Sequence, residues 1–197
     1  MIVAHAGVTP RVDPSAWVAP TAVVCGDVTV GPDARISYGA AVIAEGGHIE
    51  IGSTTIVLEN AVVRSTARHS TSIGDHCLVG PNAHLVGCTL EEEVFVATGA
   101  AVFHGTLPER GSEVRVNGVV HLRSRLERGT VVPIGWVAVG DPANVFPPDR
   151  HDDIWAVQRP LDFPLTSYGI TRDEADMRAI TRRVSDALAS HRRDEEA

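Results

Sequence analysis

The sequence contains no lysine. All 17 of its basic residues are arginine, and 25 acidic residues give a net charge of −8. This absence excludes a Schiff-base lysine, a P-loop lysine and a lysine general base. The acidic balance argues against nucleic acid as a partner, because nucleic-acid binding needs a basic face. The three cysteines, an odd number, are interpreted as reduced thiols rather than a disulfide framework.

Long apolar runs are also missing. No apolar stretch approaches the ~20 residues that cross a bilayer, so we expect no membrane partner. The first residues, Met1 to His5, have neither the basic region nor the apolar core of an export signal. We therefore expect a cytoplasmic protein.

Aromatic residues make up only 5% of the chain, whereas valine is abundant. Of 28 valines, 26 lie at or before Val145. This change in composition predicts two parts: a β-rich domain over residues 1–145 and a different segment over residues 146–197. The second part begins as a proline-rich, loop-like arm, and we expect its aromatic residues to cover the surface of the first part: Trp155, Phe163 and Tyr168.

A C-terminal α-helix is expected after this arm. Thr171 and Glu174 have the spacing of a capping box. Four apolar residues then recur on one helical face, which we expect to pack along the first part: Met177, Ile180, Val184 and Leu188. The last residues, 194–196, are acidic and are expected to fray.

The first part repeats with a period of about six residues. Aliphatic residues followed by glycine or another small residue recur through segments such as 28–36, 49–56 and 72–83. Three such hexapeptides predict one triangular coil of about 18 residues, with aliphatic side chains pointing inward. Successive coils then stack at the ~4.8 Å spacing of hydrogen-bonded strands. A β-sandwich is the weaker interpretation, because its strands alternate with period two and need no regular glycine placement.

Three segments carry a resemblance to a known family. The opening Val18-Ala-Pro-Thr-Ala-Val-Val-Cys-Gly-Asp-Val28, the central Gly80-Pro-Asn-Ala-His-Leu-Val-Gly-Cys-Thr89 and the closing Val132-Pro-Ile-Gly-Trp-Val-Ala-Val-Gly-Asp-Pro-Ala143 resemble the γ-class carbonic anhydrases of the hexapeptide-repeat superfamily. The resemblance covers about two thirds of the chain. It implies a mostly β fold, a left-handed parallel β-helix, and a homotrimer with sites between subunits.

The resemblance also implies a zinc ion held by three histidines, two from one subunit and one from its neighbour. In this sequence the matching positions are Arg64, Pro81 and Val86. Proline and valine offer no metal-binding atom. Two further family segments are replaced as well, by Ala44-Glu-Gly46 and Leu58-Glu-Asn60. We therefore expect no zinc at the usual position and no carbon dioxide hydration of the usual kind, and the sequence specifies no other cofactor.

The guanidinium of Arg64 introduces a fixed positive charge where the zinc would be. We expect Glu59 or Glu45 to balance it, and we include Asn82 in the same ligand-binding group. Such a site suits bicarbonate, a carboxylate or a phosphate. The alternative is a plain ion pair between Arg64 and a glutamate, with no ligand.

Histidines form a second candidate group. Steps of 17, 18 and 17 residues place His69, Val86, His104 and His121 in one predicted column of stacked coils. This arrangement makes His104 and His121 neighbours and makes His69, His104 and His121 candidates for a displaced metal site. His84, His104 and His121 are also candidates for a catalytic base.

Three functions follow from these observations. The first is a trimer that binds an anion or another small molecule at an altered site. The second is a metalloenzyme with a displaced histidine site and residual carbonic-anhydrase-type activity. The third is a CoA-dependent acyltransferase of the same superfamily, with a histidine base in a groove between subunits.

Overall fold

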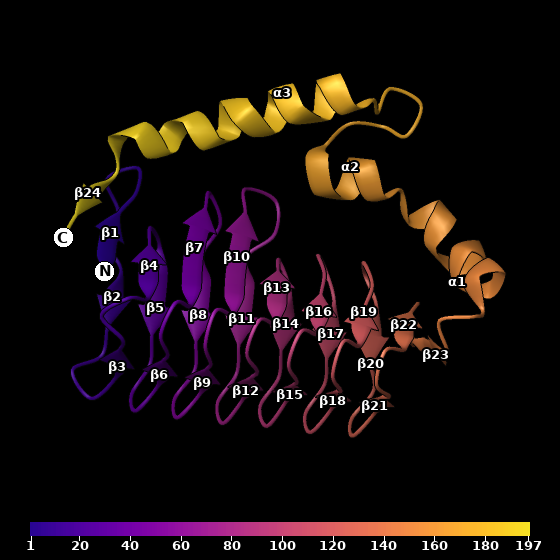
Figure 1. The fold of residues 1–197 in the computed structure, drawn as a ribbon, viewed down its shortest axis with the longest axis horizontal. Coiled ribbons are helices and arrows are strands. Elements are labelled where there is room, and N and C mark those ends of the chain that lie inside the picture. The colour runs from indigo at the N-terminus through magenta and orange to yellow at the C-terminus, as the bar shows by residue number, and fades with distance from the viewer.

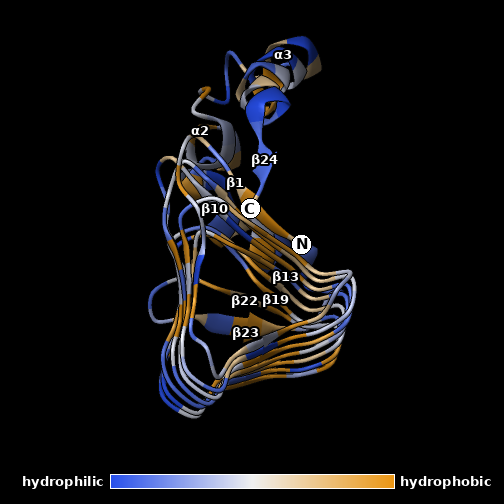
Figure 2. Cartoon of the chain, turned by 90° about the vertical axis from the view of Figure 1, so that its left-hand side faces the viewer, coloured by the Kyte–Doolittle hydropathy of each residue, from blue (hydrophilic) through white to orange (hydrophobic).

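The computed structural model describes residues 1–197, and most of it is a triangular solenoid (Figures 1 and 2). Strands β1 to β21 form seven coils of three strands each, and β22 begins an eighth. The strands pair in parallel from coil to coil, as the hexapeptide pattern requires. The predicted left-handed β-helix followed by a C-terminal helix is confirmed.

Each face of the triangle is a sheet that runs the length of the solenoid. The first sheet contains β1 (Ile2–Ala4), β4 (Val23–Cys25), β7 (Ala41–Glu45), β10 (Val62–Thr66), β13 (His84–Val86), β16 (Ala101–Val102), β19 (Val119–Val120), β22 (Val137–Val139), β23 (Asn144–Phe146) and β24 (Glu195–Glu196). The second face contains β2 (Arg11–Val12), β5 (Val28–Val30), β8 (Ile49–Ile51), β11 (Thr71–Ile73) and β14 (Thr89–Leu90), with β17 (Leu107–Pro108) and β20 (Arg125–Leu126) as a separate pair. The third sheet contains β3 (Trp17–Val18), β6 (Arg35–Ile36), β9 (Ile56–Val57), β12 (Leu78–Val79), β15 (Phe95–Val96), β18 (Glu113–Val114) and β21 (Val131–Val132).

The core is a stack of small aliphatic side chains inside the triangle. Along the first sheet, each coil contributes one fully buried residue that pairs in register with the next: Val24, Val42, Val63, Leu85, Val102, Val120 and Ala138. Neighbouring residues point to opposite faces of a strand, so the residues beside this stack face outward. The narrow interior accounts for the excess of valine and the scarcity of aromatic residues.

Three loops interrupt the regular coils. Most steps along the first sheet are 17 or 18 residues, but Ile2 pairs with Val24, Ala41 with Val62 and Val62 with His84. These longer steps come from excursions at residues 4–11, 45–49 and 66–71, which lie at the corner of the first and second faces (Figure 1). The second and third excursions follow the strands that carry Glu45 and Arg64, so they shape the surroundings of these side chains.

The C-terminal segment is more helical than predicted. The arm contains α1 (His151–Gln158), the 3₁₀ helix η1 (Arg159–Leu161) and α2 (Phe163–Tyr168), and α3 (Met177–Leu188) is followed by the 3₁₀ helix η2 (Ala189–Arg193). The predicted capping box is wrong, because Asp176 caps α3 by accepting a hydrogen bond from the amide of Ala179. Thr171 and Glu174 instead bond to each other in the preceding turn.

The C-terminal segment runs back to the N-terminal coil. α3 runs back along the first sheet toward the N-terminal coil, and β24 pairs with β1 (Figure 1). The predicted frayed end is therefore wrong: Glu195 and Glu196 lie in register with Ala4 and Val3. None of the helices combines the length and the apolar composition needed to cross a membrane.

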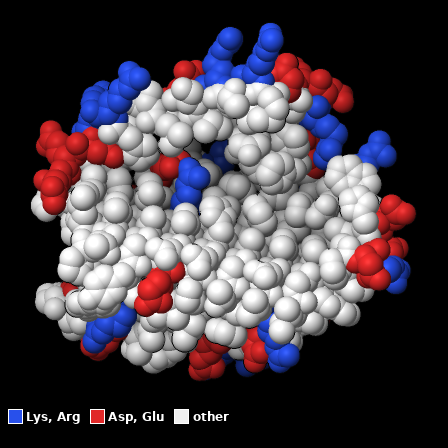
Figure 3. Space-filling view, in the orientation of Figure 1, with Lys and Arg blue, Asp and Glu red and all other residues white.

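The apolar face of α3 is only partly covered within one chain. Ile180 and Val184 are half-buried, whereas Met177 is 68% exposed and Leu188 is 43% exposed. Figure 3 shows a hollow between α3 and the solenoid, with charged side chains of both signs around it. The expectation that this helix packs its apolar stripe onto the solenoid therefore holds only for the middle of the stripe in the single chain.

We expect Leu85→Ala to lower the free energy of unfolding by about 2–5 kcal/mol, because it opens a cavity in a stack that cannot collapse without moving the coils. The matched control is Leu165→Ala, whose side chain is 38% exposed and should change stability by less than about 0.5 kcal/mol. Urea denaturation at one fixed protein concentration measures both. Equal losses in the two variants would contradict the assignment of Leu85 to the core.

Candidate functional site

Arg64 lies on the outer face of the first sheet, in a row set by the strand register. Its partner on β13 is Val86, and its partner on β7 is Ile43. Val63, next in the chain, is fully buried, so the Arg64 side chain points outward. Two of the three positions where zinc ligands were expected, 64 and 86, are thus direct neighbours on one face.

Arg64 forms an ion pair with Glu45, one of the two acidic residues expected to balance it. The distance from its Nη2 to Glu45 Oε2 is 2.5 Å, and both side chains are partly buried. The Nε of Arg64 is buried and has no hydrogen-bond partner. The other oxygen of Glu45 lies 3.8 Å from Nε2 of His191, so this carboxylate lies between the guanidinium and an imidazole. The guanidinium keeps a donor that is not satisfied within the chain.

Glu59 and Asn82 have other partners. Glu59 accepts a hydrogen bond from the hydroxyl of Ser37 at 2.7 Å, and this bond lowers the pKa of the Glu59 carboxyl. Asn82 occupies a corner of the solenoid with φ of 57°, a conformation that asparagine tolerates better than most residues. The backbone N–H of Asn82 donates to the backbone oxygen of Glu59. The structure therefore places neither of these side chains in a contact with Arg64.

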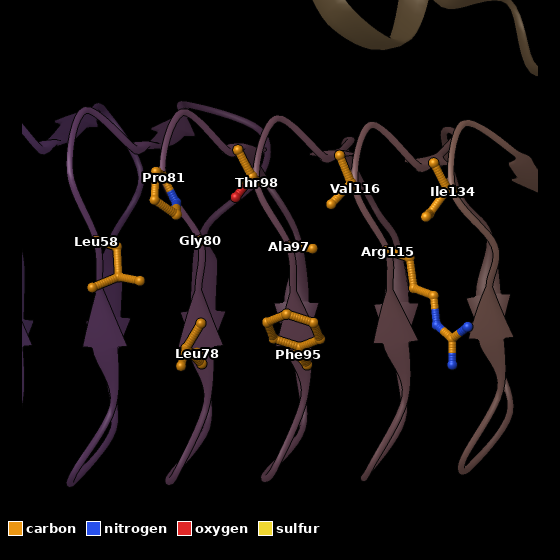
Figure 4. A pocket seen from close by; sticks show the side chains of 10 residues that line it. All are labelled: Leu58, Leu78, Gly80, Pro81, Phe95, Ala97, Thr98, Arg115, Val116 and Ile134. Carbon is orange, nitrogen blue, oxygen red and sulfur yellow. The ribbon is translucent and has the colours of Figure 1, made fainter.

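Pro81, at the third expected ligand position, lies on a different face. It follows β12 of the third sheet and lines an open groove of ≈ 400 Å³ (Figure 4). The groove is mostly apolar, and its lining residues are Leu58, Leu78, Gly80, Pro81, Phe95, Ala97, Thr98, Arg115, Val116 and Ile134. Because Arg64 and Val86 point from the first sheet, position 81 does not meet them within one chain.

Three of the predicted histidines gather close to Arg64. The rings of His69 and His104 lie 5.4 Å apart edge to face, and His104 is only 6% exposed. Burial, with the nearby His69, His84 and Arg64, lowers the pKa of His104 to about 4. Burial and Arg64 also lower the pKa of His84. Nδ1 of His104 has no hydrogen-bond partner, so the group is a neutral, partly unsatisfied cluster.

The prediction that His104 and His121 are stacked neighbours on adjacent coils is wrong. Val102 pairs with Val120, so the next pair in the ladder is Phe103 with His121, whose rings lie 6.1 Å apart. His104 is one residue further along and faces the corner of the coil. The step from Leu85 to Val102 is 17 residues and the step from Val102 to Val120 is 18. Because of this one-residue difference, Phe103 and not His104 lies next to His121.

His121 is covered by the arm rather than by another histidine. Its ring lies 6.5 Å from that of Phe163 in α2, which in turn contacts Tyr168 edge to face. Burial lowers the pKa of His121, and its Nδ1 has no partner. Phe163 and Tyr168 therefore cover the surface as predicted, whereas Trp155 is 41% exposed beneath the guanidinium of Arg172.

Sequence reasoning missed a second cluster, at the N-terminal coil. The side chains of His5, Cys25, His191 and Asp194 bring their ligand atoms within 4.8 Å of one another. No local motif joins these residues, because 189 positions separate His5 from Asp194. The only sequence signal is that two histidines, a cysteine and an aspartate lie near the two ends of the chain.

Comparison with known proteins finds gamma carbonic anhydrases among the similar sequences. The chain is 35% identical to gamma carbonic anhydrase 1, mitochondrial, of Arabidopsis thaliana over 140 residues, which cover 68% of this chain and 49% of that protein. It is 33% identical to gamma carbonic anhydrase 2, mitochondrial, of the same plant, with the same coverage. The chain spans about half the length of these curated relatives. No protein-family model matches it.

A solved structure is similar over nearly the whole chain. It is the crystal structure of a hexapeptide transferase family protein from Anaplasma phagocytophilum, with a TM-score of 0.54 and 27% identity. The similarity covers 96% of this chain and 93% of that one, so it includes the C-terminal segment.

We expect the stability of the protein to fall with acidification, in part through His104. The folded pKa is about 4 and an unfolded histidine titrates near 6.5, so the unfolded state gains the proton first. Neutral His104 contributes about 3 kcal/mol to the free energy of unfolding above about pH 6.5, and this contribution is lost progressively toward pH 4. The variant His104→Gln should lose this part of the pH dependence of the free energy of unfolding. The variant His151→Gln, at an exposed histidine, should keep it. Denaturant unfolding between pH 4 and 7 measures it, and parallel curves for wild type and His104→Gln would contradict the assignment.

Proposed function

The chain belongs to the γ-carbonic-anhydrase-like family of hexapeptide-repeat proteins, and from this premise we propose that it is a homotrimer that binds a small anion between subunits and does not hydrate carbon dioxide through zinc. The observation that carries the proposal is Arg64 beside Val86 on the outer face of the first sheet. A fixed cation and an aliphatic side chain occupy positions where a zinc site needs imidazoles.

The residues at these positions do not fit zinc. A zinc that activates water needs three donor atoms and one open position. Arg64 carries only N–H donors and is already paired with Glu45, while Pro81 and Val86 have no side-chain donor atom. No step of the proposed function therefore passes through a metal at this place.

The arrangement of the faces supports a trimer. Position 81 projects from the third sheet, while positions 64 and 86 project from the first, so a complete site needs two chains. The apolar groove around Pro81 and the exposed apolar side chains of α3, Met177 and Leu188, are surfaces that association would bury. In this arrangement the partner subunit's Pro81 faces Arg64 across the boundary.

The unsatisfied donors support an anion as the ligand. The Nε of Arg64 is buried without an acceptor, which is an unfavourable state for a guanidinium. The neutral His84 and His104 beside it each carry one N–H that can also donate. A carboxylate or bicarbonate offers oxygens to both kinds of donor, and its charge complements the arginine.

A second candidate function is acyl transfer. Its specific support is the group of neutral histidines, since a base must be unprotonated, together with the similarity to a hexapeptide transferase family protein. His84, His104 and His121 remain the candidate bases. CoA binding, measured by calorimetry with acetyl-CoA, distinguishes this function from anion binding alone.

We expect sodium bicarbonate or acetate at saturating concentration to raise the melting temperature by about 3 °C, because the ligand binds the folded trimer and not the unfolded chain. Arg64→Gln should abolish the shift. The control Arg128→Gln changes an exposed arginine on another coil and should preserve it. If no anion shifts the melting temperature of the wild type, Arg64 and Glu45 form a plain ion pair and the proposal fails.

We expect zinc to leave the carbon dioxide hydration rate of the wild type at the uncatalysed level. The triple variant Arg64→His, Pro81→His and Val86→His should gain zinc-dependent hydration, because it restores three imidazoles around the boundary. Stopped-flow pH-indicator assays measure the rate, and sedimentation analysis verifies the trimer. Each single variant is the matched control. Zinc-stimulated hydration by the wild type would contradict the proposal.

A further inference from the structure

The chain end is joined to the first coils by four side chains that do not belong to the Arg64 site. They are His5, which directly follows β1, Cys25 at the end of β4, His191 in η2, and Asp194 beyond it. We propose that these four residues form a Zn²⁺ site that fastens the C-terminal segment to the N-terminal coil.

The geometry of the cluster converges on one point. Asp194 lies 2.6 Å from Nδ1 of His5 through one oxygen and 2.7 Å from Nδ1 of His191 through the other. The thiol of Cys25 donates to Asp194 at 3.7 Å. The two imidazole rings stack with their centroids 4.3 Å apart, and both turn Nδ1 toward Asp194. No other group of three or more histidine, cysteine or acidic side chains in the structure gathers its ligand atoms this closely.

The donor set fits zinc. Thiolate, imidazole and carboxylate are its common protein ligands, and four of them make the closed tetrahedral arrangement of a structural site. Zinc bonds of about 2.0–2.3 Å place such ligands about 3.3–3.7 Å apart. The separation between Cys25 and Asp194 already has this size, and the two histidine–aspartate distances need to open by less than about 1 Å.

The charge and the burial of the four side chains favour a bound divalent metal ion over a cluster held together by hydrogen bonds alone. Cys25 is 3% exposed and His5 is 7% exposed, so the site is largely dry. One thiolate, one carboxylate and two neutral imidazoles sum to −2, which Zn²⁺ neutralises. On binding, the Cys25 thiol and any protonated imidazole release their protons to solvent as the metal–ligand bonds form.

The surrounding groups support the metal-bound orientation of His191. Its Nε2 faces Glu45 at 3.8 Å, and Glu45 is held by Arg64. A carboxylate behind a ligating imidazole is the usual second partner of a metal-bound histidine. The same glutamate therefore adjoins both the altered ligand position and the proposed zinc site.

The site spans elements that are distant in sequence. It joins the turn after β1, the end of β4, and the segment made of η2 and the residue that follows it. Apart from it, the end of the chain is held mainly by the two-residue pairing of β24 with β1. A metal at this place therefore fixes the end of α3 against the first coil.

The test is a cobalt titration of the full-length protein after chelation, under reducing conditions. Co²⁺ takes the place of zinc in tetrahedral sites and reports a thiolate ligand through a charge-transfer band in the near ultraviolet. We expect one Co²⁺ per chain, this band, and displacement of Co²⁺ by Zn²⁺. Saturating Zn²⁺ should also raise the melting temperature by about 5 °C or more.

Variants locate the metal. Cys25→Ser should remove the charge-transfer band, and His191→Ala should weaken cobalt binding at least about tenfold. His191→Ala also covers the case in which the buried Cys25→Ser variant does not fold. The controls are Cys77→Ser, which changes a buried cysteine outside the cluster, and the exposed His151→Ala.

Several results would overturn the proposal. The absence of a cobalt–thiolate band in the wild type would mean that the four residues form a hydrogen-bonded clasp without metal. A band that persists in Cys25→Ser would place the metal elsewhere. Cobalt binding without a thiolate band would point to the histidines near Arg64, which include no cysteine. The anion test at Arg64 uses a different ligand and variant, so either proposal can fail alone.

Discussion

The backbone hydrogen-bond ladder between coils determines the position of every side chain in this protein. Within the solenoid, short strands pair in parallel with those of the next coil, and the core stack from Val24 to Ala138 depends on unbroken register along the first sheet. One residue more or less in a coil moves a side chain from the interior to the surface or to a corner. The site near Arg64 is therefore a consequence of coil lengths as much as of residue types.

The solenoid could be predicted because its signal is local and repeated. Aliphatic residues at a period of six define the coils. This period does not predict the pairing of Arg64 with Val86, because the 22-residue step between them includes the excursion at residues 66–71. The ion pair between Arg64 and Glu45 was one of the two expected, and it forms because their strands pair directly. The stacking of His104 on His121 was wrong because consecutive coils differ by one residue in length. Periodicity predicts the average coil and not each individual one.

The C-terminal segment could not be predicted to the same degree. The apolar spacing of Met177 and its partners did indicate a helix, but Asp176 provides the cap and Thr171 does not. The cluster of His5, Cys25, His191 and Asp194 forms only because α3 runs back along the solenoid. Contacts of this kind depend on the length and direction of the arm, and no local pattern encodes them. Glu45 connects this cluster to the altered ligand position, so the two regions share one carboxylate.

The two antiparallel strands at the ends of the first sheet have a consequence for how molecules meet. A stack of parallel coils presents unpaired backbone groups at its first and last coil, and such edges can template the addition of another molecule. Here β24 covers the edge of β1, and β23 covers the edge of β22. Two solenoids that joined end to end would have to continue all three sheets in parallel register. The antiparallel strands β24 and β23 prevent this continuation in the first sheet, one at each end. The chain thereby carries its own protection against growth into fibres.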